Sequence, residues 1–212
     1  AGILCMWDAS GYLWWSVMEL VLHGVDFSGA DSGGSQKIVV ATRNGSGEVV
    51  IRRRISRIEL RTMILESMGQ PSAQLWRIDA PFSLSSSMYQ RHGIEPSWRA
   101  LAEWMSGFAS ARDWRRAMRA VDRKEPKRTC DRVARTPMAP MNLRVFKQTW
   151  TVIRDVLLPL ADAGVHIAPL HRTESSVLVT EGCPASVLFA RGESSRGYKG
   201  SSDGHCQRRS RL

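Results

Sequence analysis

The sequence predicts an α/β protein in which a mixed five-stranded sheet begins with three antiparallel strands. Three apolar strands joined by short turns fill residues 19–55, and a helix over 57–68 then leads to a fourth strand over 75–80. A strand–helix–strand connection of this kind joins parallel strands, which favours pairing of the fourth strand with the first. At 212 residues, the chain has the length of one domain with one core.

The first strand is apolar on both of its faces. Leu20 and Leu22 share one face and Val21 and Val25 the other, because side chains alternate along a strand. This pattern is typical of a central strand that is covered on two sides. The strand ends on Asp26, whose carboxylate is costly to bury unless it is paired, hydrogen-bonded or bound to a metal.

The other elements follow from turn signals and periodicity. An Asn44-Gly45 turn separates the second strand (37–42) from the third (48–55), and such a turn is a strong hairpin signal. The later elements predicted are helices over 98–108 and 143–163, a short apolar run over 166–170, a fifth strand over 177–181 and a helix over 184–190.

The two ends of the chain differ from the middle. Residues 1–17 lack a positively charged start and carry Asp8 inside their apolar portion, which makes them a poor signal peptide. We expect 1–17 to be a non-native or disordered leader and 18–212 to form one domain with a basic helical insertion over about 85–142. The last residues show no apolar periodicity, and we expect the C-terminus to be incomplete.

Composition favours a nucleic-acid partner. The net charge is +10 and the sequence pI is near 10.2, which suits a polyanion, either DNA or RNA. No apolar run of 18 residues or more exists, so we expect no membrane span. Four scattered cysteines without a C-x-x-C pair indicate a reducing compartment, and we expect a cytoplasmic protein.

Three predicted strands end on an acid, and these acids are the candidate catalytic residues. They are Asp26, Asp79 and Glu181. Carboxylate oxygens are the ligands that Mg²⁺ and Mn²⁺ prefer, and converging strand ends would hold such ions rigidly. Two ions can activate water and stabilise the leaving oxygen of a phosphodiester. The alternative is that each acid only caps the turn or helix that follows it.

The stretch from Arg112 to Arg135 contains ten basic residues. One interpretation is a solvated helix and loop, and the other is a segment that contacts phosphates. Trp114 could then offer a stacking surface for bases, although tryptophan more often belongs to a core. The residues predicted to bind nucleic acid are Arg115, Arg116, Arg119, Lys127 and Arg128.

Three motifs resemble a family of predicted nucleases of the ribonuclease H-like superfamily, which is described mostly as a domain of unknown function. The motifs are Gly24-Val25-Asp26-Phe27-Ser28-Gly29-Ala30, Ile78-Asp79-Ala80-Pro81-Phe82 and Thr180-Glu181-Gly182-Cys183-Pro184-Ala185. Residues 129–132, 143–150 and 198–200 are similar to further parts of it. The resemblance implies helices on both faces of the sheet, fourth and fifth strands parallel to the first, and metal binding by the three acids. The chain departs from the family at Gly182-Cys183, where related sequences tend to have a bulkier pair.

Three functions compete at this point. The first is a metal-dependent nuclease that hydrolyses phosphodiester bonds. The second is a non-catalytic nucleic-acid-binding module of the same fold, which the positive charge also suits. The third is a nucleotide phosphotransferase similar to actin and the sugar kinases, in which the Ser/Gly turn after Asp26 would meet phosphates. Those proteins close two such domains around a cleft, and this length supplies one.

Overall fold

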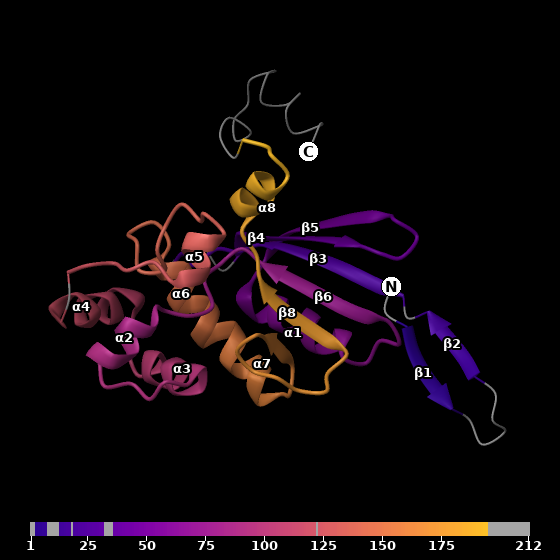
Figure 1. The fold of residues 1–212 in the computed structure, drawn as a ribbon, viewed down its shortest axis with the longest axis horizontal. Helices are drawn as coiled ribbons and strands as arrows, with labels where there is room; N and C mark the ends of the chain where they lie inside the picture. Colours follow the sequence, from indigo (N-terminus) through magenta and orange to yellow (C-terminus); the bar gives the residue numbers. More distant parts are fainter. Residues whose placement is uncertain (1–2, 8–12, 18, 32–35, 122, 195–212) are drawn as a thin grey trace.

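The computed structural model describes residues 3–7, 13–17, 19–31, 36–121 and 123–194, and its main feature is a six-stranded mixed sheet (Figure 1). The strands are β1 (Ile3–Trp7), β2 (Leu13–Val17), β3 (Leu20–Asp26), β4 (Ile38–Arg43), β5 (Val49–Ile55), β6 (Ala73–Ile78), β7 (His166–Ala168) and β8 (Val177–Glu181). The helices are α1 (Arg57–Ser67), α2 (Ser86–Arg91), α3 (Trp98–Ser106), α4 (Ala111–Val121), α5 (Thr129–Val133), α6 (Phe146–Thr151), the π-helical segment η2 (Val152–Leu157), α7 (Leu158–Asp162) and α8 (Pro184–Ala190).

The sheet order is β5-β4-β3-β6-β8-β7. Strands β3, β4 and β5 are antiparallel, whereas β6 is parallel to β3, β8 to β6 and β7 to β8. The predicted meander and the parallel pairing of the first and fourth strands are therefore confirmed, and the topology is consistent with a ribonuclease H-like sheet. The predicted number of five strands is wrong. The short apolar run near residue 167 pairs with β8 as a sixth, edge strand.

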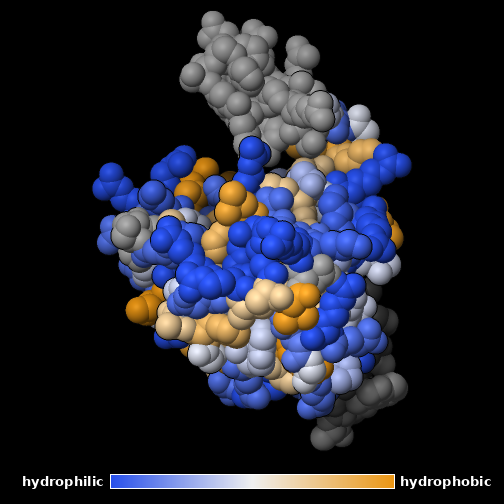
Figure 2. All heavy atoms as spheres, turned by 90° about the vertical axis from the view of Figure 1, so that its left-hand side faces the viewer, coloured by the Kyte–Doolittle hydropathy of each residue, from blue (hydrophilic) through white to orange (hydrophobic). Residues whose placement is uncertain are grey.

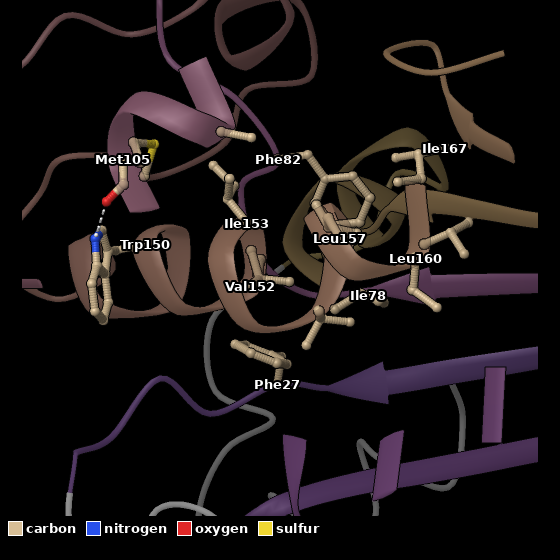
Figure 3. Close-up of a cluster of buried hydrophobic side chains, with 14 of the residues drawn as sticks. Phe27, Ile78, Phe82, Met105, Trp150, Val152, Ile153, Leu157, Leu160 and Ile167 are labelled. Atoms are coloured by element: carbon tan, nitrogen blue, oxygen red, sulfur yellow. Dashed lines mark hydrogen bonds between the residues drawn. The ribbon is translucent and has the colours of Figure 1, made fainter. Parts of the chain in front are cut away.

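One face of the sheet carries the core. His23, Val25, Trp76, Ile78 and Val179 alternate toward this face and are buried. The long helix α6–η2–α7 packs on it beside α1, and α3 packs on the other side of the long helix. Figure 3 shows side chains of the long helix lying between the sheet residues on one side and α3 on the other, where Trp150 Nε1 donates to the Met105 carbonyl oxygen at 3.0 Å. We call this face the packed face.

The opposite face is only partly covered within the described part of the chain. Leu22, Leu75 and Leu178 lie side by side on it, half-buried and outside the core cluster, and Gly24 is exposed. Val187 of α8 shares a pocket with Gly24, so α8 reaches this face at the strand ends. The expectation of helices on both faces is thus met on the packed face. On the opposite face, the described residues place a helix only at the strand ends. We call this second face the open face.

The long helix contains a widened turn for a local reason. Pro159 has no N–H to donate to the carbonyl of Asp155, four residues earlier, and its ring crowds that carbonyl. The helix widens into the π-helical segment η2 before this proline. Arg61 Nη1 donates to the Asp155 carbonyl oxygen at 3.4 Å in place of the missing backbone N–H. Arg57 Nε pairs with the Asp155 carboxylate at 3.0 Å, which ties α1 to the long helix.

The remaining segments lie around this framework. Strands β1 and β2 form a separate two-stranded antiparallel sheet, and whether residues 1–17 are native stays a prediction. The predicted insertion of 85–142 contains α2 to α5. Residues 198–200, which contributed to the resemblance, lie outside the described part of the chain. None of the described helices is long and apolar enough to cross a membrane.

Candidate carboxylate site at the strand ends

Asp26 and Asp79 end neighbouring parallel strands and come together. Val25 pairs with Ile78 across the two strands, and the backbone N–H of Asp79 donates to the Val25 carbonyl oxygen at 2.9 Å. The hydrogen-bond ladder therefore continues one residue past β6. Asp79 lies level with Asp26 on the neighbouring strand, at a backbone separation of roughly 4.8 Å. This confirms that the two strand ends are neighbours.

A pocket of about 380 Å³ opens beside these two acids on the open face. Arg77 lines it as well, and it is an exposed residue of a central strand. Gly24 forms part of its wall, and a side chain there would meet nothing within 4 Å of its Cβ position. The pocket therefore combines two carboxylates and one guanidinium around open space, at the carboxyl ends of parallel strands, where ligands bind in open α/β sheets.

Glu181 also ends a strand, but it is one residue out of line with the two aspartates. It pairs with Ile78, whose side chain lies on the packed face, and the Gly182 N–H donates to the Ile78 carbonyl oxygen at 2.8 Å. Gly182 is therefore the residue level with Asp79. Because side chains alternate along a strand, this single residue of offset directs Glu181 away from the open face.

Arg128 holds Glu181 in place. Its Nη1 and Nη2 donate to the two carboxylate oxygens of Glu181 at 2.7 Å and 2.5 Å, and the backbone N–H of Phe82 donates to the same carboxylate at 2.9 Å. Arg128 also makes a two-pronged contact with Asp131, at 3.0 Å from Nε and 2.6 Å from Nη2. Such forked pairs are among the strongest charged hydrogen bonds in proteins.

Arg128 and Asp131 are buried in this network, Glu181 is partly exposed, and one guanidinium contacts two carboxylates. Burial lowers the pKa of Arg128, but hydrogen bonds to Glu181 and Asp131 outweigh it and leave that pKa above its usual range. Burial raises the pKa of Asp131, and the hydrogen bonds from Arg128 bring it below its ordinary value. The arrangement joins α5, which lies in the basic insertion, to the end of β8.

The carboxylates suit a divalent ion to different degrees. Among the described residues, no group of three or more His, Cys, Asp or Glu side chains is arranged to hold a metal. Mg²⁺ in phosphate-handling sites is commonly held by one or two carboxylates, and substrate phosphates and water complete its shell. Asp26 and Asp79 fit that description. To bind an ion, the Glu181 carboxylate would first have to release its hydrogen bonds from Arg128. Its role as a metal ligand stays a prediction.

A second pocket of about 490 Å³ adjoins the first and shares Arg77, Gly182, Cys183 and Val187 with it. The wall of this second pocket includes Glu181 and Arg128. Together the two pockets form a continuous depression along the ends of β3, β6 and β8, large enough for part of an extended ligand.

The predicted nucleic-acid-binding residues are divided between two environments. Arg115, Arg116 and Arg119 surround a pocket of about 560 Å³ beside α4, together with Arg112. This side of the molecule faces the viewer in Figure 2 and is largely hydrophilic. Carboxylates already contact three of these guanidinium groups: Glu125 binds Arg115 and Arg119, and Asp113 binds Arg116.

The other members of that set are less accessible. Lys127 Nζ donates to the Thr136 carbonyl oxygen at 2.6 Å, and Arg128 is buried in the network described above. Trp114 lies in the core, so it does not offer a stacking surface to bases. The assignment of the five basic residues to nucleic acid stays a prediction, and Arg116 and Arg119 are the exposed ones, whereas Arg115 is mostly buried against Glu125.

Sequence reasoning missed two residues of the site. Arg77 interrupts an otherwise apolar strand that the sequence marks as central, and such a charge was itself a signal. Gly24, two residues before Asp26 and on the same face, marks the space in front of the acid. In contrast, Gly29 serves packing, because a Cβ there would overlap the backbone of Lys147 and Gln148 in α6. That close approach gives the turn after Asp26 a structural role.

No protein-family model, curated protein or solved structure matches this chain. The ribonuclease H-like family therefore stays a prediction from the three motifs, and the comparisons support no activity.

Proposed function

We propose that this protein is a metal-dependent nuclease that hydrolyses phosphodiester bonds at the open-face pocket. The observation that carries the proposal is the convergence of Asp26 and Asp79 from adjacent parallel strands on one open pocket beside Arg77. Two neighbouring carboxylates attract a divalent cation, and the guanidinium is suited to a phosphate oxygen. A basic chain then supplies attraction for the polyanion.

Each residue has a defined part in this proposal. Asp26 and Asp79 hold Mg²⁺ or Mn²⁺, which supplies Lewis-acid activation of water and of the scissile phosphate. Arg77 orients the phosphate from the centre of the sheet. Glu181, through Arg128, fixes the far wall of the depression and the position of α5. The sequence-based hypothesis that Glu181 is a third ligand makes a different prediction, which the experiment below separates from this one.

The test is Mg²⁺- or Mn²⁺-dependent cleavage of single-stranded, duplex, hybrid and branched DNA and RNA by four purified proteins. These are the wild type, Asp26→Asn, Asp79→Asn and Glu181→Gln. The amide substitutions keep the shape of the side chains and remove their charge. We expect both aspartate variants to lose about a hundredfold or more in rate. We expect Glu181→Gln to keep its dependence on metal concentration and to lose about 1–3 kcal/mol of unfolding free energy, because Arg128 loses a charged partner.

The outcomes separate the competing functions. Cleavage that is unaffected by Asp26→Asn comes from a contaminant and contradicts the site. A requirement for much higher metal concentration in Glu181→Gln makes Glu181 a ligand. Absence of cleavage in all four proteins, with binding of the oligonucleotides retained, favours the non-catalytic binding module.

A further inference from the structure

A cluster of three consecutive arginines lies at the edge of the sheet, outside the basic stretch that the sequence singled out. Arg52, Arg53 and Arg54 are exposed residues of β5, which forms one edge of the six-stranded sheet (Figure 1). None of the three has an ion-pair partner within the described part of the chain. We call them the edge arginines.

The strand pairing places the edge arginines at the same end of the sheet as the carboxylates. Asp26 pairs with Val39 of β4, and the next residue of β4, Val40, pairs with Arg52 of β5. The edge arginines are therefore two strands away from Asp26, at a backbone separation of roughly 10 Å. An extended arginine side chain can place its charge closer to the pocket than this backbone separation.

The backbone is distorted where these residues lie. The pairing of β4 with β5 shifts between Ile38 and Val40, so that an extra residue of β5 is accommodated as a β-bulge. Within the bulge Arg54 adopts φ 61°, in the left-handed region that a long side chain rarely occupies. Bulges redirect side chains and are over-represented beside active sites, and a strained non-glycine residue is kept only where the surrounding structure holds it.

Like charges in succession at an exposed edge repel one another, and no described carboxylate relieves them. In the basic stretch the opposite holds, since Glu125 and Asp113 contact three of the four arginines around the α4 pocket. The edge arginines are therefore the more available anion-binding groups. Charges on an edge strand also prevent edge-to-edge aggregation, and any charged residue serves that purpose.

We propose that Arg52, Arg53 and Arg54 bind the phosphodiester backbone of a nucleic acid and guide it along the sheet edge toward the pocket of Asp26 and Asp79. The inference rests on the proposed function for the destination of the strand. The contact itself does not depend on hydrolysis. Arg53 and Arg54 lie opposite Val39, the partner of Asp26, whereas Arg52 pairs with the buried Val40, so the edge arginines flank both sides of the sheet edge. The successive phosphates of a nucleic-acid backbone suit guanidinium groups spread along an edge better than one compact anion does.

The experiment measures binding of fluorescent single-stranded and duplex oligonucleotides by anisotropy, in EDTA so that no cleavage intervenes. The proteins are the wild type, Arg53→Gln, the triple variant Arg52→Gln/Arg53→Gln/Arg54→Gln and Arg172→Gln. Arg172 is the matched control, because it is exposed, has no described ion-pair partner and follows β7 at the opposite edge of the sheet. Salt is varied from about 50 to 200 mM for each protein.

We expect the triple variant to bind single strands about tenfold more weakly and to lose about 2 from the slope of log K against log salt, since each phosphate contact contributes about 0.7. Arg53→Gln loses about 0.7 from the slope, and Arg172→Gln stays within about twofold of the wild type. A similar loss in Arg172→Gln, or an unchanged slope in the triple variant, overturns the proposal.

Two further measurements keep the result specific. If the triple variant aggregates in size-exclusion chromatography but binds nucleic acid normally, edge protection is the role of these residues and the proposal is wrong. If the wild type binds anionic lipid vesicles as tightly as oligonucleotides, and the triple variant binds both equally weakly, the partner is a membrane surface and the proposal is also wrong. Cleavage by the triple variant at saturating substrate reports separately on the proposed function.

Discussion

Carboxylates at the strand ends have different environments on the two faces of the sheet. On the open face, Asp26 is exposed beside a pocket that it shares with Asp79 and Arg77. On the packed face, Glu181 is held by Arg128, which also neutralises the buried Asp131. An offset of one residue in strand register causes this difference, because Gly182 and not Glu181 is level with Asp79. The parity of each strand-end carboxylate therefore decides whether it faces the open-face pocket or contacts Arg128.

The same contrast applies to the arginines. Arg128 serves the framework, and its burial would be costly without its two carboxylates. Arg77 of the open face and the edge arginines are exposed and have no ion-pair partner among the described residues. Basic composition alone does not distinguish the two groups, since all of them contribute equally to the net charge of +10. Burial and ion pairing do distinguish them, because Arg128 is buried and contacts two carboxylates whereas the others are exposed.

The largest expected effect comes from removing the arginine of the packed face. Arg128→Met leaves Asp131 and Glu181 without their countercharge, and breaking a buried pair costs about 3–5 kcal/mol. Arg77→Met removes a charge from the open face and should change the unfolding free energy by less than about 0.5 kcal/mol. Denaturant unfolding of both variants checks this. Equal losses in the two would show that the faces do not differ as described.

A pair of glycine variants tests the space on each side of Asp26. Gly29→Ala places a methyl group into the backbone of α6 and should cost about 1–3 kcal/mol of unfolding free energy. Gly24→Val extends a side chain into open space and suits a strand, so stability should stay within about 0.5 kcal/mol. If the open-face pocket is the site of cleavage, Gly24→Val should still lower the rate about a hundredfold.

Circular dichroism and denaturant unfolding accompany the cleavage measurement for both glycine variants. A stable Gly24→Val protein with full activity would place the chemistry elsewhere on the molecule. A Gly29→Ala protein as stable as the wild type would show that the turn after Asp26 does not depend on its close contact with α6.

The sequence predicted most of the fold because its signals are local. The Asn44-Gly45 turn and the two-residue period of the first strand were enough for the meander. The sixth strand was missed because β7 has three residues and becomes recognisable only when β8 pairs with it. The placement of Asp26 and Asp79 followed from the connection rule. The pairing of Glu181 with Arg128 could not be predicted, because Arg128 is 53 residues away in the chain and the register of β8 is a tertiary property.

The smallest expected effect concerns a histidine of the packed face. His23 is stacked on Trp76 at 3.7 Å between ring centroids, and its ring nitrogens bond to Thr42 and Gln74 at 2.9 Å and 2.8 Å. Burial lowers its pKa, although the hydrogen bond to Gln74 acts in the opposite direction. The unfolded chain then binds more protons than the folded one just below about pH 6.5.

Stability from His23 should therefore be fully present above about pH 6.5 and decline as the pH falls toward the lowered pKa of the folded state. Denaturant unfolding of the wild type and His23→Phe between about pH 7.5 and 5.5 measures this decline. The variant keeps an aromatic ring against Trp76, so we expect lower stability overall but a flatter pH dependence. Some slope should persist, because burial and the neighbouring Arg91 also lower the pKa of His92. An unchanged slope in His23→Phe would mean that this histidine can accept a proton without loosening the packed face.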